Sequence, residues 1–253
     1  IEALKFGFGA GGCRIVPFGD DADICVINTC TVTGAGDADS RKAVRRARRV
    51  NPEATVVATG CYAHRRPDEL KEAGASLVVD NFAKPRLQER LAAHLRAEGH
   101  EFDVPERSVS SGGFLQMAGS VDFGRTRGAL QVQDGCDEHC TYCVIPSVRG
   151  AGRSRPLAEV IEQAKSMVAS GYRELALTGV HTGSYGSDRG DYRALVTLLE
   201  RLETVEGLRR VRLNSIEPGY FSEPLIEFAT TSQKLCRHFH IPLQSGNEQV
   251  LRR

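Results

Sequence analysis

Residues 129–143 read Ala-Leu-Gln-Val-Gln-Asp-Gly-Cys-Asp-Glu-His-Cys-Thr-Tyr-Cys, a strand pattern that runs directly into a loop with three cysteines. We predict a strand over residues 129–133 with the loop at its carboxyl end. The (β/α) barrels place their chemistry at the carboxyl ends of their strands. The segment therefore predicts a barrel-like α/β domain whose functional groups gather around this loop.

The residues after the loop continue the alternation of helices and strands. Periodicity predicts helices over residues 157–170 and 192–205, and strands over residues 174–178, 208–214 and 238–243. Strands separated by helices usually pair in parallel. Residues 129–253 are therefore expected to form a partial (β/α) barrel.

The first hundred residues show a second series of the same kind. Strands are predicted over residues 24–28, 55–59 and 77–79, and helices over residues 40–50, 67–73 and 85–98. This order predicts a parallel sheet of the flavodoxin or Rossmann type in a domain of residues 1–102. Residues 103–128 turn to Ser, Gly, Pro and scattered charge, which is typical of a linker.

Composition excludes several classes of protein. The chain has 253 residues, of which 41% are hydrophobic, and a net charge of +1, so its overall charge does not indicate nucleic-acid binding. No apolar run approaches the length of a membrane span, and no association with a membrane is expected. The eight cysteines come without a signal peptide, which disfavours a disulfide framework and predicts a cytoplasmic protein with metal-binding thiols.

The three cysteines of the loop, Cys136, Cys140 and Cys143, have the spacing Cys-x-x-x-Cys-x-x-Cys. Four-iron clusters normally take four cysteines, so three thiolates leave one iron open. A zinc site is the alternative, with His139 as a fourth ligand, although structural zinc usually takes separated pairs of ligands. The spacing, with Tyr142 before the last cysteine, resembles the signature of the radical S-adenosylmethionine (SAM) enzymes, in which SAM binds the open iron.

Two further cysteines, Cys30 and Cys61, each follow a predicted strand of the first domain. Residues at the carboxyl ends of neighbouring parallel strands converge on one edge of the sheet. The two thiols could therefore be ligands of a second metal centre, or they could be small packing residues. Cys25 and Cys236 fit packing positions better than ligand positions.

The predicted helix over residues 40–50 carries an arginine-rich face. Such a face is either a solvated surface or a phosphate-binding surface. The residues that we consider for RNA binding on this helix are Arg41, Arg45, Arg46 and Arg49.

Several motifs together resemble one family. They are Asn-Thr-Cys-Thr-Val-Thr at 28–33, Ser-Arg-Lys-Ala-Val-Arg-Arg-Ala at 40–47, Thr-Gly-Cys-Tyr-Ala at 59–63, the cysteine loop, Arg-Gly-x-x-Arg-Ser-Arg-Pro at 149–156, Leu-Thr-Gly-Val at 177–180, Ser-Ile-Glu-Pro at 215–218 and His-Ile-Pro-Leu-Gln-Ser-Gly at 240–246. From about Ile24 to the last residue, the chain resembles the radical SAM methylthiotransferases. The residues after Cys30 and Cys61, and Gly-Val-His-Thr-Gly-Ser-Tyr-Gly at 179–186, most resemble the MtaB type.

This resemblance implies that a methylthio group is added to C2 of N6-threonylcarbamoyladenosine beside the anticodon of a tRNA. It implies two [4Fe-4S] clusters, one on the loop cysteines and one on Cys30, Cys61 and a third cysteine. Cys13 lies too close to Cys30 to match the family's third ligand, which is expected upstream of Ile1. The family continues with further strands and an RNA-binding domain, so we expect a truncated copy.

The resemblance also assigns expected cofactor contacts, partners and RNA contacts. Flavodoxin or ferredoxin would supply electrons, while the source of sulfur is not given by the sequence. Arg153 and Arg155 could bind either a carboxylate or an RNA phosphate, and Tyr62 is a candidate platform for a flipped adenine. The expected SAM contacts are Tyr142, Thr178, Gly179, Ser215, Glu217 and Gln244.

Other functions remain open at this stage. The chain could act on isopentenyladenosine in tRNA or on an aspartate of a ribosomal protein, although the residues after Cys30 argue against both. It could also be a noncatalytic iron-sulfur RNA-binding protein, which the three-cysteine loop disfavours, or a zinc-stabilised adaptor.

Overall fold

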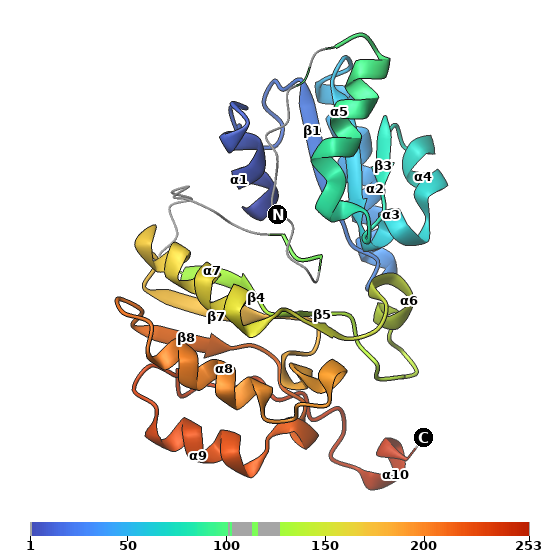
Figure 1. Ribbon diagram of the computed structural model, residues 1–253. Coiled ribbons are helices and arrows are strands. Elements are labelled where there is room, and N and C mark those ends of the chain that lie inside the picture. Colours follow the sequence, from blue (N-terminus) through green and yellow to red (C-terminus); the bar gives the residue numbers. More distant parts are fainter. Residues whose placement is uncertain (1, 101, 103–112, 116–126, 253) are drawn as a thin grey trace. The chain divides into compact units, whose positions relative to one another are not determined.

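The structure is a computed structural model that describes residues 2–100, 102, 113–115 and 127–252. The chain divides into two compact units (Figure 1). Unit 1 comprises Ile1–Val109 and Glu138–Gly150, and unit 2 comprises Ser110–Asp137 and Ala151–Arg253. Most of the expected linker, residues 103–128, lies outside the described residues. The domain boundaries expected from the sequence stay predictions.

Unit 1 is built on a parallel sheet of three strands in the order β1-β2-β3. Its strands are β1 (Ile24–Thr29), β2 (Thr55–Gly60) and β3 (Leu77–Val79). Thr29 pairs with Gly60, so β1 and β2 end side by side. The helices of this unit are α1 (Glu2–Ala10), α2 (Gly34–Val50), α3 (Cys61–Arg65), α4 (Pro67–Glu72), η1 (Lys84–Arg86), α5 (Leu87–Ala97) and α6 (Ile145–Arg149).

The central strand β2 explains why this sheet forms. All six of its residues are buried, as expected for a parallel strand covered on both faces. Val44 and Ala47 of α2, three residues apart on one helix face, join the same core with Val56 and Ala58. The apolar sequence of β2 therefore specifies a central strand.

Unit 2 contains a second parallel sheet, in the order β4-β7-β8. Its strands are β4 (Arg127–Gln131), β7 (Glu174–Thr178) and β8 (Arg210–Leu213), and the short antiparallel pair is β5 (Gln133–Asp134) with β6 (Arg153–Ser154). The helices are α7 (Leu157–Ala169), η2 (Thr182–Ser184), η3 (Ser187–Arg189), α8 (Ala194–Glu203), η4 (Pro218–Tyr220), α9 (Glu223–Thr231) and α10 (Glu248–Leu251).

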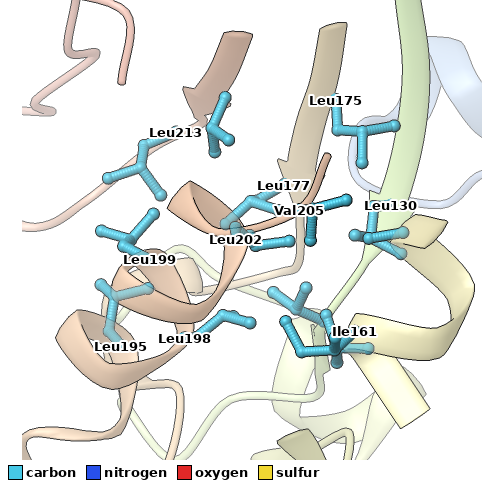
Figure 2. Close-up of a cluster of buried hydrophobic side chains, with 14 of the residues drawn as sticks. Leu130, Ile161, Leu175, Leu177, Leu195, Leu198, Leu199, Leu202, Val205 and Leu213 are labelled. Atoms are coloured by element: carbon cyan, nitrogen blue, oxygen red, sulfur yellow. The ribbon is translucent and has the colours of Figure 1, made fainter. Parts of the chain in front are cut away.

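A leucine-rich core joins this sheet to its helices (Figure 2). Four leucines of α8, at positions 195, 198, 199 and 202, have the spacing of one helix face. They belong to the same buried cluster as Leu175 and Leu177 of β7 and Ile161 of α7. Each fully buried leucine contributes about 2 kcal/mol to stability. This core therefore makes unit 2 a stable scaffold for the loops at the edges of its sheet.

The amino edge of this sheet is held by ion pairs. The nearly buried carboxylate of Glu174 lies 2.6 Å from Arg127, 2.9 Å from Arg210 and 3.4 Å from Arg212. Burial raises the pKa of Glu174, but the hydrogen bond from Arg212 and the charges of Arg127 and Arg210 outweigh it and lower the pKa. In barrel folds this edge serves stability, and the chemistry lies at the carboxyl edge.

The α/β class and the parallel sheets are confirmed, with three local differences. The predicted strand over residues 238–243 is wrong, since no strand forms there and Pro242 has no N–H to donate. On the free side of β8 the chain forms an isolated bridge between Val211 and Leu235, and the Ile216 N–H donates to the His240 carbonyl oxygen at 3.1 Å. The chain leaves β4 after Gln131, so that Gln133 pairs with Ser154 instead. Helix α2 begins at Gly34, six residues before the predicted start.

None of the described helices combines the length and the apolar character that crossing a membrane requires.

Candidate metal and cofactor site

Three segments of unit 2 with expected site residues leave the same edge of the sheet. Gln131 pairs with Thr178, and Leu177 pairs with Leu213, so the three strands end close to one level. The chain then continues into the start of the cysteine loop after β4, into Gly179 after β7 and into Ser215 after β8. The structure thus brings these predicted segments together at the carboxyl edge, as parallel pairing requires.

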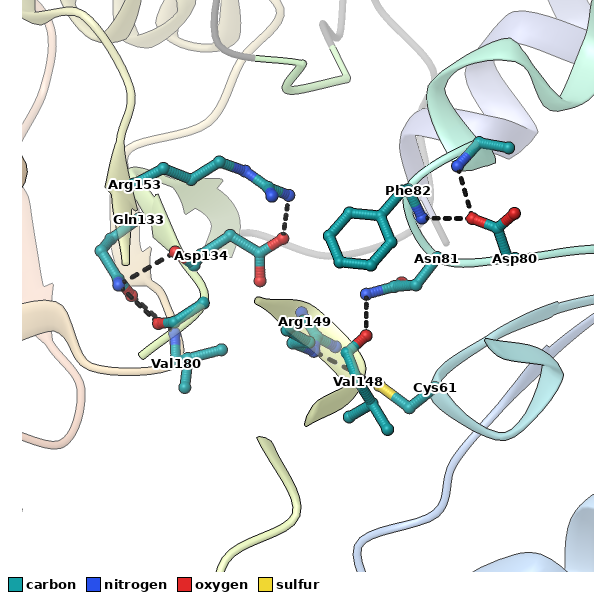
Figure 3. Close-up of polar contacts among 12 residues, drawn as sticks. Cys61, Asp80, Asn81, Phe82, Gln133, Asp134, Val148, Arg149, Arg153 and Val180 are labelled. Atoms are coloured by element: carbon teal, nitrogen blue, oxygen red, sulfur yellow. Dashed lines mark hydrogen bonds and ion pairs between the residues drawn. The ribbon is translucent and has the colours of Figure 1, made fainter. Parts of the chain in front are cut away.

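A buried glutamine joins two of these segments. Gln133 is 1% exposed, and its Nε2 donates hydrogen bonds to the carbonyl oxygens of Asp134 (3.1 Å) and Gly135 (2.7 Å). Its Oε1 accepts from the backbone N–H groups of Val180 (3.0 Å) and His181 (2.9 Å). Figure 3 shows Gln133 with two of these partners, Asp134 and Val180. Gln133 could not be recognised as a site residue from the sequence, because Val180 and His181, which fix its role, lie 47 and 48 residues further along the chain.

Gly179 lies tightly against this glutamine. A Cβ atom at Gly179 would come within 2.8 Å of Gln133 Oε1 and 3.2 Å of its carbonyl oxygen. A residue with a side chain would therefore separate the two segments. The backbone of Gly179 thus packs directly against Gln133, and the expected contact of Gly179 with a cofactor stays a prediction.

The three cysteines of the loop have free thiols. Cys140 is exposed, and Cys136 and Cys143 are partly exposed. The N–H of Cys143 donates to the carbonyl oxygen of Cys140 at 2.9 Å, which closes a turn. The ring of Tyr142 in this turn is 72% exposed.

Backbone contacts also fix the start of the loop. The N–H of Gly152 lies 3.2 Å from both carboxylate oxygens of Asp137. A Cβ atom at Gly152 would approach one of those oxygens to 2.7 Å. Arg153, the residue after Gly152, forms a 2.6 Å ion pair with Asp134. Asp134 and Asp137 flank Cys136, so the segment after the loop holds its first cysteine on both sides.

The donor chemistry of the loop fits an iron-sulfur cluster, which takes thiolate ligands. In the part of the chain that the structure describes, no three Cys, His, Asp or Glu side chains are already gathered as a metal-binding group. Metal sites commonly form together with the metal, because the ligands must first lose their protons.

Cys30 and Cys61 stand at the carboxyl edge of the sheet in unit 1. Cys30 follows β1 directly and is exposed, whereas Cys61 begins α3 and is buried. The Ser40 hydroxyl oxygen lies 3.1 Å from both the N atom and the carbonyl oxygen of Cys30. The predicted convergence of the two cysteines on one edge follows from the pairing of Thr29 with Gly60.

The thiol of Cys61 has a cationic neighbour. Nε of Arg149, at the end of α6, lies 3.3 Å from Cys61 Sγ (Figure 3). Asn81 Nδ2 donates to the carbonyl oxygen of Val148 at 3.3 Å, which helps to hold α6 in place. A guanidinium N–H that donates to sulfur stabilises negative charge on that atom. Arg149 is thus a second residue that sequence analysis missed.

The remaining cysteines fit packing roles. Burial raises the pKa of the thiols of Cys13 and Cys25. The effect at Cys25 is opposed by Asn51 Nδ2, which lies 3.8 Å from its sulfur, and by the charge of Arg48. A raised pKa disfavours the thiolate that metal binding requires. Cys236 is partly buried, and its N–H donates to the carbonyl oxygen of Val211.

The arginines of α2 have different roles. Arg45 and Arg49 are exposed, and the exposed guanidinium of Arg46 lies 5.3 Å from the centre of the Phe18 ring. Arg48 donates hydrogen bonds to the carbonyl oxygens of Pro52, Ala54 and Gly74, which serves the fold. Only part of the basic helix therefore offers charge to a partner.

Arg41 belongs to a cluster with Tyr62 and Glu69. Its Nη1 lies 2.9 Å from Glu69 Oε2 and donates to the Tyr62 hydroxyl, which donates to Glu69 at 2.5 Å. The Tyr62 hydrogen bond and the Arg41 charge lower the pKa of Glu69, whereas burial raises the pKa of Tyr62. Tyr62 is 0% exposed. The prediction that an adenine stacks on Tyr62 is wrong, because no face of its ring is accessible.

The other expected site residues of unit 2 differ in exposure. Arg155 is 2% exposed, its pKa is lowered by burial, and its Nε lies 3.7 Å from Glu159, a placement that fits an internal ion pair. Ser215 and Glu217 are partly exposed, and Ser215 Oγ lies 2.7 Å from His240 Nδ1. Gln244 is exposed and has a φ of +62°. For a residue other than glycine, this backbone is uncommon and is found at ligand-binding sites.

Two family models match the chain. Residues 2–80 match the Uncharacterized protein family UPF0004, and residues 130–253 match the Radical SAM superfamily. The second match begins at the strand that leads into the cysteine loop.

Curated proteins with similar sequences carry one recurring name. The chain is 39% identical to the threonylcarbamoyladenosine tRNA methylthiotransferase MtaB of Bacillus subtilis, over 100% of this chain and 56% of that protein. It is 40% identical to the protein of the same name from Aquifex aeolicus, over 99% and 60%. A tRNA-2-methylthio-N(6)-dimethylallyladenosine synthase of Desulfosudis oleivorans is 32% identical, over 96% and 53%. The chain thus spans between about half and 60% of the length of these relatives.

A solved structure shares the fold. The radical S-adenosylmethionine methyltransferase TsrM from Kitasatospora setae matches with a TM-score of 0.59 and 17% identity, over 88% of this chain and 50% of that one. The cysteine loop, the family models and the MtaB relatives together lead to one assignment. The chain belongs to the radical SAM methylthiotransferase family, in its MtaB-type branch.

Proposed function

We propose that this chain carries the catalytic residues of an enzyme that adds a methylthio group to C2 of N6-threonylcarbamoyladenosine in tRNA. The observation that carries the proposal is the loop of Cys136, Cys140 and Cys143, which follows the first strand of a parallel sheet at its carboxyl edge. The identity of the proposed substrate is taken from the names of the MtaB relatives.

The loop cysteines would hold a [4Fe-4S] cluster, and the carboxyl edge of unit 2 would bind SAM. A bound cluster of this kind and SAM supply one-electron reductive cleavage of the sulfonium and hydrogen abstraction from the substrate. The chain's own residues bind, orient and shield these groups, since the difficult chemistry belongs to the cofactors. Thr178, Gly179, Ser215, Glu217, Gln244 and Tyr142 are the proposed contacts with SAM.

Cys30 and Cys61 would hold a second [4Fe-4S] cluster with one further ligand. Their position side by side at the end of β1 and β2 supports this role, and so does the Arg149 guanidinium beside Cys61. A cluster bound by three thiolates carries net negative charge, which a cation close to the sulfur offsets. This second site would provide the sulfur that is transferred.

The tRNA would lie along the exposed part of α2, at Arg45, Arg46 and Arg49. These side chains follow Cys30 by between 15 and 19 positions on an unbroken helix that starts close to Cys30. Guanidinium groups bind phosphates with two parallel hydrogen bonds. Arg153 is a further candidate for a phosphate or carboxylate, although Asp134 already pairs with it.

The iron-loaded enzyme is incubated without oxygen with SAM, a reductant and tRNA containing threonylcarbamoyladenosine, and the nucleosides are analysed by mass spectrometry. We expect 2-methylthio-threonylcarbamoyladenosine from the wild type and none from Cys140→Ala. Failure of the wild type to modify this tRNA would refute the proposal.

A second tRNA in the same reaction tests the closest alternative. The Desulfosudis relative is named for dimethylallyladenosine, so a tRNA with that base is included in equal amount. Exclusive modification of the dimethylallyl base would show that the chain has that activity instead. We expect the threonylcarbamoyl base to be modified instead.

A further inference from the structure

We propose that Gln133 is a positioning residue that couples the cysteine loop to the binding of the α-ammonium group of SAM. The inference rests on the proposed function and concerns a residue that does not itself hold iron. Its basis is the set of four hydrogen bonds that the buried Gln133 side chain makes to the two segments.

The acceptor half of the amide orients the segment after β7. A trans peptide points its N–H and its C=O in opposite directions. Because the N–H groups of Val180 and His181 point to Gln133 Oε1, the carbonyl groups of Gly179 and Val180 point away from it. Carbonyl oxygens held in fixed directions are suitable acceptors for an ammonium group, which is a donor only.

The donor half orients the start of the cysteine loop in the same way. Nε2 holds the carbonyl groups of Asp134 and Gly135, so the N–H groups of Gly135 and Cys136 point away from Gln133. The direction of the Cys136 backbone, and hence the place from which its thiol extends, depends on this contact. One rigid amide thereby fixes the direction of the Cys136 backbone and the direction of the carbonyl groups proposed to accept the ammonium group.

Only a neutral primary amide makes all four bonds. A glutamate of the same shape would still accept from Val180 and His181, but it would turn an acceptor toward the carbonyl oxygens of Asp134 and Gly135. Gln133→Glu therefore breaks the donor half alone and preserves volume. The matched control is Gln163→Glu, the same change at a buried glutamine of α7 in the same unit.

The experiment titrates SAM into iron-loaded protein. Binding is monitored by calorimetry and by the EPR signal of the reduced cluster. We expect Gln133→Glu to retain its iron and to raise the dissociation constant for SAM about tenfold, which corresponds to about 1.4 kcal/mol. Gln163→Glu should stay within about twofold of the wild type. An unchanged SAM affinity in Gln133→Glu overturns the inference.

If the proposed function is wrong, the SAM titration gives a different result. In that case the wild type itself would show no response of the cluster signal to SAM, whatever the Gln133 variants do. A normal response of the wild type, together with equal affinities in the wild type and in Gln133→Glu, would leave the proposed function intact and refute only the role of Gln133.

A measurement on the wild type decides the question if Gln133→Glu does not fold. Hydrogen exchange of the peptide containing residues 179–182 is compared in iron-loaded protein with and without SAM. Coupling through Gln133 predicts that SAM slows exchange of the Val180 and His181 amides about tenfold. Equal exchange in both states means that Gln133 only supports the fold, and overturns the inference.

Discussion

Replacement of Gly60 by alanine should disrupt the edge of unit 1 that carries both Cys30 and Cys61. Gly60 has φ of +105° and ψ of −164°, a backbone region that is essentially restricted to glycine. A Cβ atom there would come within 2.4 Å of the Thr29 carbonyl oxygen and 2.9 Å of the Thr29 nitrogen. Both contacts are with backbone atoms of β1, which cannot rotate away.

The size of the effect follows from these two observations. Strain at such a backbone costs about 1–3 kcal/mol, and forcing an extra methyl group into a packed site costs about 1–3 kcal/mol more. We therefore expect Gly60→Ala to lower the free energy of unfolding by about 4 kcal/mol, the sum of the two central values. In a protein of this size the midpoint of thermal unfolding should fall by about 8–16 °C.

The assay is urea unfolding of the metal-free protein, followed by circular dichroism, with iron content measured after reconstitution. Relief of the clash must move Thr29, and Cys30 moves with it, so iron bound at this edge should fall as well. The control is Gly9→Ala in α1, where a Cβ atom meets no atom within 4 Å. Helix propensity predicts that this control is stabilised by up to about 1 kcal/mol. If Gly60→Ala lowers the free energy of unfolding by less than about 1 kcal/mol, neither the backbone strain nor the clash with Thr29 is present.

Three other predictions concern charged residues. Joint replacement of Arg45 and Arg49 by alanine should weaken tRNA binding and reduce the slope of log affinity against log salt by about 1.5–2, measured by titration at several salt concentrations; Arg48→Ala should instead lower stability by about 1–3 kcal/mol, because Arg48 bonds to backbone carbonyl groups. Arg149→Ala should lower the iron content of protein that lacks the loop cysteines, because the cation beside the Cys61 sulfur is lost; iron content equal to that of the parent would contradict this role. Glu174 has a pKa below its ordinary value of 4.5, so its ion pairs stabilise the protein above that pH and fail as the pH falls through the lowered pKa; the stability difference between wild type and Glu174→Gln should shrink from pH 6 to pH 3 in urea unfolding, and a constant difference would contradict it.

The strands that carry the candidate ligands could be predicted from sequence, because each is a short apolar run. Residues 24–28, 55–59 and 77–79 were predicted within one residue of β1, β2 and β3. Parallel pairing then predicted that Cys30 and Cys61 lie at the same edge. Local pattern and a general rule of sheet geometry were sufficient there.

Two segments were predicted incorrectly because a single residue overrides the tendency of its neighbours. Gly34 and Gly36 indicate a loop by propensity, but Thr33 caps the helix at this point, and its side chain accepts from the Gly36 N–H at 3.1 Å. Residues 238–243 have strand-like composition, but Pro242 limits their pairing with β8.

Side-chain roles were the least predictable part of the candidate site. Arg48 and Arg49 are adjacent in a basic run, and nothing local shows that one holds backbone carbonyl groups while the other faces solvent. Tyr62 resembles an exposed aromatic residue after a ligand, yet it is buried beside Glu69. Gln133 and Arg149 acquire their partners only when the chain folds.

EPR of the reduced, iron-reconstituted protein with and without SAM decides whether the loop cysteines hold a cluster with an open iron. The matched variants are Cys136→Ala, which removes one loop ligand, and Cys236→Ala, which removes a cysteine outside the loop. We expect a cluster signal that shifts when SAM is added, persists in Cys236→Ala and loses the shift in Cys136→Ala. A signal that does not respond to SAM, or a response that survives in Cys136→Ala, would contradict the claim that the loop cysteines form an open-iron site.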